Sequence, residues 1–194
     1  MSEKISLIVG LGNPGQQYES TRHNAGFWFL DRIVEHHGVP FRADAKMYGE
    51  IAKVTINGNP VWLLKPSTFM NRSGQAVSAL ASYYKIPLES ILVTHDELDL
   101  PPGQLRLKYG GGHAGHNGLR DIIAHMGKEF ARLRVGIGRP EHPGPVTDYV
   151  LGNPGKASRE LIDDALDDTE CVLDKIVGGE VELAMNRLHG RGKA

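Results

Sequence analysis

The chain of 194 residues has a single cysteine, Cys171, and no long hydrophobic run. One cysteine excludes internal disulfides and zinc sites built on cysteine, so we interpret Cys171 as a packing residue. The longest apolar stretches fall far short of the roughly 18 residues that suggest a membrane helix. The N-terminus also lacks the basic start and long apolar segment of a signal peptide. We therefore expect a soluble, cytoplasmic protein with no membrane partner.

Common hydrolase signatures are missing as well. The chain contains no G-x-S-x-G nucleophile elbow, and neither an H-E-x-x-H nor a D-x-H-x-x-H metal motif. If this protein hydrolyses a bond, the nucleophile is expected to be water.

Charge is unevenly distributed along the chain, although the net charge is only -1. Residues 159–182 hold nine acidic and two basic residues, which leaves 20 basic and 14 acidic residues elsewhere. The resulting surplus of positive charge permits a basic face that could bind a polyanion. The same asymmetry is typical of a solvated acidic helix, so charge alone does not establish nucleic-acid binding.

Hydrophobic periodicity predicts one α/β domain over residues 1–194, with a twisted, mixed and mostly parallel β-sheet flanked by α-helices. Strands are predicted at 5–10, 50–56, 61–65, 91–94, 105–109 and 132–138. Helices are predicted at 24–37, 74–84, 119–126, 158–177 and 181–188, the fourth capped by Ser158. Residues 140–154 carry four of the eleven prolines and are predicted to form an irregular loop or lid.

Three of the predicted strands end on polar clusters. The strand at 5–10 leads to Asn13, the strand at 61–65 is soon followed by Met70 and Asn71, and the strand at 91–94 leads to His95 and Asp96. Ligands of open α/β sheets lie outside the carboxyl ends of the strands. We therefore expect these clusters to meet in one crevice.

Residues 10–15, GLGNPG, match the dinucleotide-binding pattern G-x-G-x-x-G. That fold needs a helix that begins at the glycines and an acidic residue at the end of the next strand. Here the helix is predicted to begin only near residue 24, and a hairpin without such an acid follows. We expect no dinucleotide cofactor, and we interpret the glycines as a tight turn that presents Asn13.

His23 is the leading candidate for a general base. A lone histidine is more often structural than catalytic, but this one is predicted to lie at the crevice. Asp96, at another strand end, would supply the carboxylate that fixes the histidine tautomer. Neutral amides at Asn13, Asn71 and Asn117 suit recognition of a peptide backbone, whereas Asn24 is interpreted as a turn residue.

A metallohydrolase is an alternative interpretation of one polar set, whose spacing resembles metal ligands only loosely. The set comprises His95, Asp96, Glu97, Asp99, His113 and His116. We expect no metal.

Five motifs occur in this order along the chain: GLGNPG, TRHNAG, KPSTFMNRSG, HDELDLPPG and GGGHAGHNGLRDI. With them the chain resembles the bacterial-type peptidyl-tRNA hydrolases over nearly its whole length. The resemblance implies hydrolysis of the ester between a peptide and tRNA, which recycles tRNA from prematurely released peptidyl-tRNA, without cofactor or metal. A tRNA-binding module without catalysis remains the alternative from another class.

The resemblance also implies a role for individual residues. His23 would be the general base that activates water, and Asp96 would orient it. Substrate and water would be placed by Asn13, Asn71 and Asn117. The peptide side of the crevice would be lined by Tyr18, Met70 and His116.

The tRNA partner would be held by its acceptor stem and 5′-phosphate, with its 3′ CCA end in the crevice of a monomer. The resemblance assigns this basic clamp to Lys108 and Arg134, with help from Arg106. Without the resemblance, Arg132 and Arg134 would be interpreted as ordinary charges on a strand surface. The chain departs from the family at Ala114, where glycine is usual, and in a lid that lacks a lysine for which Arg139 could substitute.

Overall fold

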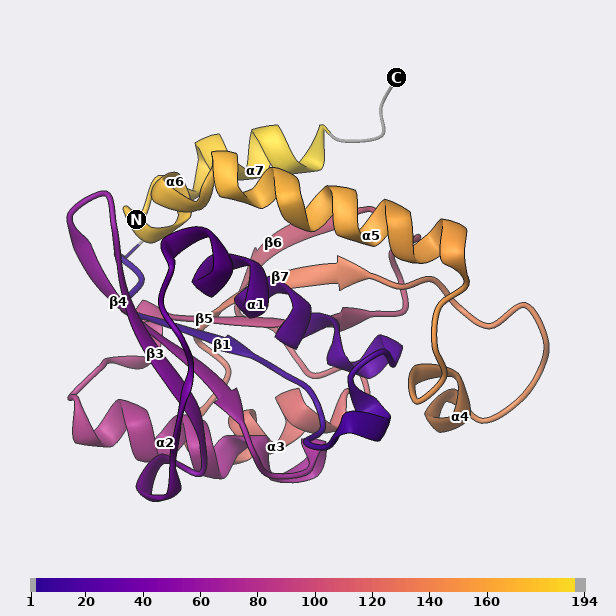
Figure 1. The fold of residues 1–194 in the computed structure, drawn as a ribbon, viewed down its shortest axis with the longest axis horizontal. Coiled ribbons are helices and arrows are strands. Elements are labelled where there is room, and N and C mark those ends of the chain that lie inside the picture. The colour runs from indigo at the N-terminus through magenta and orange to yellow at the C-terminus, as the bar shows by residue number, and fades with distance from the viewer. Residues whose placement is uncertain (1–2, 191–194) are drawn as a thin grey trace.

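The computed structural model describes residues 3–190 and shows one seven-stranded sheet between two layers of helices (Figure 1). The strands are β1 (Leu7–Gly10), β2 (Arg42–Asp44), β3 (Gly49–Ile56), β4 (Asn59–Pro66), β5 (Ile91–Glu97), β6 (Leu105–Tyr109) and β7 (Ala131–Gly136). The α-helices are α1 (Ala25–His37), α2 (Ser73–Tyr83), α3 (Asn117–Met126), α4 (Val146–Val150), α5 (Lys156–Asp168), α6 (Leu173–Val177) and α7 (Val181–His189). Short 3-10 helices are η1 (Gln16–Tyr18), η2 (Arg22–Asn24), η3 (Ala45–Met47), η4 (Met70–Arg72), η5 (Leu88–Ser90) and η6 (Thr169–Cys171).

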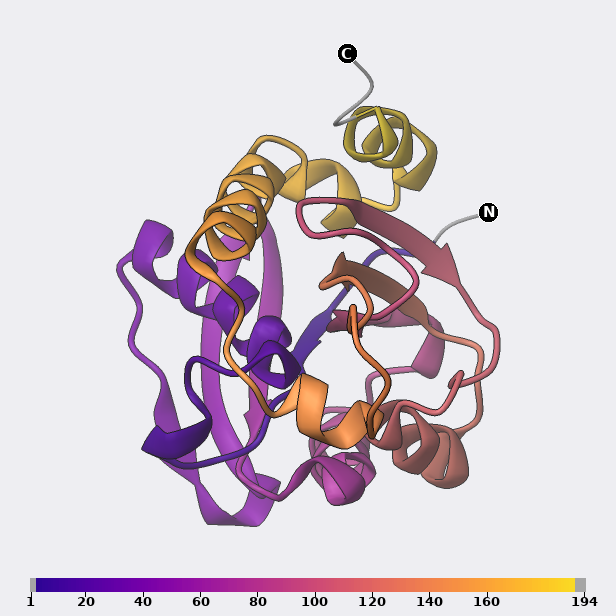
Figure 2. The same cartoon turned by 90° about the vertical axis from the view of Figure 1, so that its right-hand side faces the viewer.

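The strand order is β2-β3-β4-β1-β5-β7-β6. The four inner strands, β4, β1, β5 and β7, are parallel, whereas β2, β3 and β6 join the two edges antiparallel. The carboxyl ends of the inner strands therefore lie at one edge of the sheet, and Figure 2 looks toward this edge with α4 in front of it. The predicted mixed α/β fold is confirmed.

The core has two parts, one on each face of the sheet. Helices α1, α5, α6 and α7 cover one face, and α2 and α3 cover the other (Figure 1). The inner strand β1 has no exposed position, because it is covered on both faces, whereas buried and exposed residues alternate along part of β3. This accounts for the continuous apolar run in one strand and the alternating pattern in the other.

Helix α1 approaches the sheet so closely that only glycine fits at its first turn. A Cβ on Gly26 would lie 2.4 Å from the carbonyl oxygen of Thr94 and 2.5 Å from the backbone nitrogen of Leu11. Close approach of backbone to backbone is a common reason for glycine at a fixed position. The contact holds the start of α1, and with it His23, against the ends of β1 and β5.

The structure corrects several sequence-based predictions. Residues 140–154 are not wholly irregular, since they contain α4, and the short edge strand β2 was not predicted. The helix predicted over 158–177 begins at Lys156 after Gly155, so Ser158 is not its cap, and it is interrupted by η6. At the interruption the Thr169 hydroxyl donates a 2.5 Å hydrogen bond to the Leu166 carbonyl, which competes with helical bonding.

Two further predictions concern Cys171 and the turn at residues 10–15. Cys171 is exposed, so its interpretation as a packing residue was wrong. The predicted late start of the helix after the GLGNPG turn is confirmed, because α1 begins at Ala25, ten residues after the last glycine of the motif at Gly15. None of the helices within residues 3–190 has the length and apolar character needed to span a membrane.

Candidate active site

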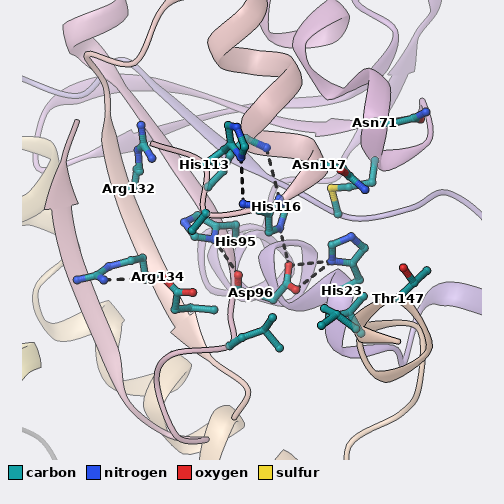
Figure 3. A pocket seen from close by; sticks show the side chains of 18 of the residues that line it. His23, Asn71, His95, Asp96, His113, His116, Asn117, Arg132, Arg134 and Thr147 are labelled. Carbon is teal, nitrogen blue, oxygen red and sulfur yellow. Dashed lines mark hydrogen bonds and ion pairs between the residues drawn. The ribbon is translucent and has the colours of Figure 1, made fainter. Parts of the chain in front are cut away.

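A cavity of about 550 Å³ opens at the carboxyl edge of the sheet (Figure 3). Its walls come from the segments that follow β1 and β4, from η2, from the carboxyl end of β5, from β6 and β7, from the Gly-rich loop before α3 and from α4. The sequence-predicted site residues that line it are Asn13, His23, Met70, Asn71, His95, Asp96, Glu97, Lys108, His113, His116, Asn117 and Arg134. The expectation that the polar strand ends meet in one crevice is confirmed.

The centre of the cavity is a buried carboxylate between two imidazole rings. His23 Nδ1 lies 2.9 Å from Asp96 Oδ2, and His116 Nε2 lies 2.8 Å from Asp96 Oδ1. Because an ionised carboxylate only accepts hydrogen bonds, both ring nitrogens donate to it. Figure 3 shows the two rings on either side of Asp96. The proton on His23 is thus held at Nδ1, which leaves Nε2 as the basic nitrogen.

Electrostatics favour the charged carboxylate and a basic His23. Burial opposes ionisation of Asp96, but the His23 and His116 rings and their hydrogen bonds outweigh it and hold the pKa of Asp96 well below its usual range. Burial also disfavours the protonated His23 ring, yet the Asp96 charge and hydrogen bond leave the pKa of His23 above its ordinary value. A histidine tuned in this way is suited to accept a proton near neutral pH.

His116 is held by the first turn of α3. Its Nδ1 accepts hydrogen bonds from the backbone N–H groups of Gly118 and Leu119, at 3.2 and 3.3 Å. The side chain is therefore the N-cap of α3, and its only ring proton is on Nε2, which points to Asp96. The sequence analysis named His116 only as a residue that lines the peptide side of the crevice, and it did not predict the hydrogen bond to Asp96.

The same tautomer bears on metal binding. His23, Asp96 and His116 offer three possible ligand atoms within 4.8 Å of one another. A metal would need the lone pair of His116 Nε2, but Nδ1 already accepts from the amides of the helix. The ring would therefore have to lose its one N–H proton and become an imidazolate, or move that proton to Nδ1 and give up its capping bonds. The donor set therefore does not fit a metal ion.

His95 of the sequence-predicted metal set does not bond to the Asp96 carboxylate, although its ring lies edge-on to the His116 ring, with centroids 5.1 Å apart. Its Nδ1 lies 2.8 Å from the carbonyl oxygen of Asp96, whereas its buried Nε2 has no partner within residues 3–190. Burial, reinforced by the nearby His116 ring, lowers the pKa of His95 to about 3, so the ring is neutral.

Asn13 is fixed by three hydrogen bonds. Its Oδ1 accepts from the backbone N–H of Met70 at 2.8 Å. The Asn24 side chain accepts from the Asn13 N–H at 2.8 Å and donates to the Asn13 carbonyl at 3.0 Å. Asn24 is buried and is not the simple turn residue predicted from sequence. These three bonds use the backbone and the Oδ1 atom of Asn13. Its Nδ2 group is therefore the donor that Asn13 can offer to the cavity that it lines.

The other two asparagines are exposed at the rim. Asn71 follows Met70 in η4, and Asn117 is the first residue of α3. Tyr18 does not line the cavity, and its ring instead contacts Phe69 edge-on, with centroids 6.3 Å apart. Phe69 is 58% exposed and does line the cavity, although sequence reasoning did not single it out.

Basic side chains lie on one side of the cavity, along β6 and β7. Arg106 pairs in register with Arg134, and Lys108 pairs with Arg132, so all four lie on one face of the sheet. Arg134 lies 3.8 Å from Glu97, whereas Arg106 donates to the Leu105 carbonyl and does not line the cavity. The residues predicted as a tRNA clamp are therefore neighbours.

Arg132 departs from its interpretation as a surface charge. It is 2% exposed, and its guanidinium donates to the carbonyl groups of Gly111 and Gly112 in the Gly-rich loop. Ala114 in the same loop adopts a φ of 48°, a left-handed conformation that favours the glycine usual in the family.

Helix α4 forms the opposite wall, which is largely apolar. Val146, Val150 and Leu151 line the cavity there. Arg22, the neighbour of His23, donates to the Tyr149 carbonyl at 2.9 Å and stacks on the Tyr149 ring. Arg139 forms an exposed ion pair with Asp99 at the same rim. The segment predicted as a lid is thus bonded directly to η2, which carries His23.

Replacement of Asn24 by alanine is expected to lower the free energy of unfolding by about 2–4 kcal/mol, because it leaves a buried N–H and a buried carbonyl of Asn13 without partners. Urea unfolding of Asn24→Ala and of Asn186→Ala, an exposed asparagine on α7, measures the difference. Equal stabilities would show that Asn24 has no anchoring role.

Comparison with known proteins agrees with this site. The family model described as Peptidyl-tRNA hydrolase matches residues 7–194. A protein of Alcanivorax borkumensis named Peptidyl-tRNA hydrolase is 53% identical over 98% of both chains, and one of Neisseria meningitidis is 51% identical over 98% of this chain and all of that one. The crystal structure of peptidyl-tRNA hydrolase from Acinetobacter baumannii superimposes with a TM-score of 0.93 at 48% identity, covering 97% of this chain and 96% of that one. The chain described here belongs to the peptidyl-tRNA hydrolase family.

Proposed function

We propose that this protein hydrolyses the ester that joins a peptide to the terminal ribose of tRNA. The observation that carries the proposal is the buried His23–Asp96 pair, whose proton is on Nδ1 and whose Nε2 faces a cavity of about 550 Å³. Such a pair is suited to activate water, and an ester of a ribose hydroxyl is a better acyl donor than an amide.

In the proposed reaction His23 Nε2 takes a proton from a water molecule as the water attacks the ester carbonyl. Asp96 stabilises the imidazolium that forms. The carboxamides of Asn13, Asn71 and Asn117 position the substrate and the water, and those that donate an N–H lower the energy of the developing oxyanion. His23 then returns the proton to the departing ribose oxygen, which frees tRNA and peptide.

The two sides of the cavity suit the two halves of this substrate. Met70 and the apolar wall of α4 are placed to contact the peptide, with Tyr18 acting through Phe69. His116, by contrast, acts mainly by holding Asp96. The amides read peptide backbone rather than side chains, so many peptides would be accepted.

The basic side would hold the nucleic acid. Lys108 and Arg134 would bind the 5′-phosphate and acceptor stem, and Arg106 is the register partner of Arg134 in the β6–β7 ladder. A cavity of about 550 Å³ is too small for a tRNA, so it would hold the ester and the groups next to it, and most of the tRNA would lie outside. We further propose that the protein works as a monomer in the cytoplasm, where tRNA is used.

Replacement of His23 by alanine is expected to reduce turnover of N-acetyl-aminoacyl-tRNA by about 10²–10⁴-fold, because the general base is lost. Peptide release by the wild type and the variant measures this. Unchanged turnover in His23→Ala would remove His23 from its role, and saturable tRNA binding without cleavage by the wild type would favour a non-catalytic tRNA-binding module. Loss of wild-type activity with a chelator would favour the metallohydrolase.

Replacement of Asp96 by asparagine is expected to shift the pH dependence of kcat/KM. The base must be neutral, so kcat/KM falls as the pH drops through the raised pKa of His23. In Asp96→Asn the carboxylate that raises this pKa is gone while burial still lowers it, so the acidic limb moves to lower pH and the plateau falls. Asp164→Asn, at an exposed position of α5, serves as the control. An acidic limb that stays in place would contradict the pairing.

Loss of a clamp residue is expected to act on tRNA binding. Lys108→Ala or Arg134→Ala should raise KM for full-length N-acetyl-aminoacyl-tRNA and reduce the salt dependence of KM by about one ion per lost phosphate contact. Cleavage of a short N-acetyl-aminoacyl ester of the CCA trinucleotide should be nearly unchanged. Equal losses on both substrates would refute the clamp.

A further inference from the structure

Arg132 is a buried cation whose partners are all neutral. Its Nη1 atom donates to the Gly112 carbonyl at 2.5 Å, and Nη2 donates to the carbonyls of Gly111 and Lys128 at 2.5 and 3.2 Å. The guanidinium also lies over the Phe130 ring, 4.4 Å from its centroid. Within residues 3–190 no carboxylate lies within ion-pair distance of Arg132.

The surrounding charges add to this cost. Lys108 is its register partner on β6, and Arg134 is two residues farther along β7 on the same face. Burial, together with the Arg134 charge, lowers the pKa of Arg132, and the Glu129 carboxylate, which forms no ion pair with Arg132, offsets this only in part. A buried charge without a counter-ion is unfavourable unless its hydrogen bonds are worth more than the desolvation. Strand formation alone therefore does not explain why Arg132 is buried against these carbonyls.

The carbonyl acceptors belong to a loop that has little structure of its own. Residues 110–116 join the end of β6 to the start of α3. Left-handed φ angles occur at Gly110, Gly111, Ala114 and Gly115, so no helix or strand holds the segment. The arginine fork is the side-chain contact that fastens the first turn of this loop to β7. Figure 3 shows Arg132 and the loop residue His113 among the residues around the cavity.

The loop connects the two functional parts of the cavity. Lys108 lies just before it, His116 is its last residue, and Asn117 follows it. A displacement of the loop would therefore move the ring that donates to Asp96 and the amide at the start of α3. Misplacement of about 1 Å at a reaction centre can lower the rate by about 10²-fold.

We infer that Arg132 is a positioning residue, which fastens the Gly-rich loop to β7 and thereby places His116 and Asn117 at the reaction centre. The inference rests on the proposed esterase function. It assigns Arg132 to the chemical step, in contrast to Lys108 and Arg134, which bind phosphate. The fork geometry matters here more than the charge, because lysine is a point charge that cannot hold two successive carbonyls in the plane of one group.

The test compares Arg132→Lys and Arg132→Met with Arg42→Met, which removes an exposed arginine from the opposite edge of the sheet. Both Arg132 variants are expected to lower kcat by about 10–10²-fold on full-length N-acetyl-aminoacyl-tRNA and on the CCA trinucleotide ester alike. The salt dependence of KM should stay as in the wild type, and Arg42→Met should match the wild type throughout.

Two kinetic results would overturn the inference. Wild-type kcat in Arg132→Lys would show that only the charge matters. A loss confined to KM for full-length tRNA, with a weaker salt dependence, would place Arg132 in the phosphate clamp.

A second readout does not depend on catalysis. In protein labelled with ¹⁵N at histidine, the His116 Nε2–H proton bound to Asp96 is expected to give a downfield signal in the wild type and in Arg42→Met. In folded Arg132→Lys this signal should shift or broaden, and an unchanged signal would contradict the positioning role. If the wild type cleaves neither substrate, the proposed function fails, while the NMR comparison still decides whether Arg132 holds the loop.

Discussion

The site depends on one buried negative charge. The Asp96 carboxylate lies at the end of a central strand, where burial alone would favour its neutral form. It stays ionised because two imidazole N–H groups donate to it, one from His23 before α1 and one from His116 at the start of α3. Each ring in turn has its proton fixed by that carboxylate. The arrangement requires β1, β5 and α3 to meet at one edge of the sheet.

Irregular segments around this centre are held by buried polar side chains rather than by regular secondary structure. Asn24 supplies a donor and an acceptor to the backbone of Asn13, and Arg132 donates to two carbonyls of the Gly-rich loop. The half-buried Arg22 fastens the short helix α4 through the Tyr149 carbonyl. Buried amide and guanidinium groups are costly without partners, so each contact strongly favours one loop position. The groups proposed to act on substrate are thereby placed before substrate arrives.

The cavity has one largely apolar side and one basic side. The apolar wall of α4 and Phe69 lies toward the side proposed for peptide, and the β6–β7 ladder brings four cations onto one sheet face. This ladder also accounts for part of the positive surplus left when the acidic C-terminal region is set aside. The net charge of the chain conceals this separation because the acidic residues concentrate in and around α5 and α6, on the other face of the sheet.

Periodicity and the order of motifs were enough to predict the α/β class, most strands and helices, and the crevice where polar strand ends meet, since these follow from local patterns of apolar residues. They also pointed to His23 and Asp96 as partners. The break between α5 and α6, the exposure of Cys171 and the short elements β2 and α4 were not predicted, because they depend on packing against distant segments. The roles of Asn24 and Arg132 were misread for the same reason: an asparagine or arginine looks like a turn or surface residue until the backbone groups it bonds are known. Those groups come from residues 11 and about 20 positions away, and only the folded chain brings them together.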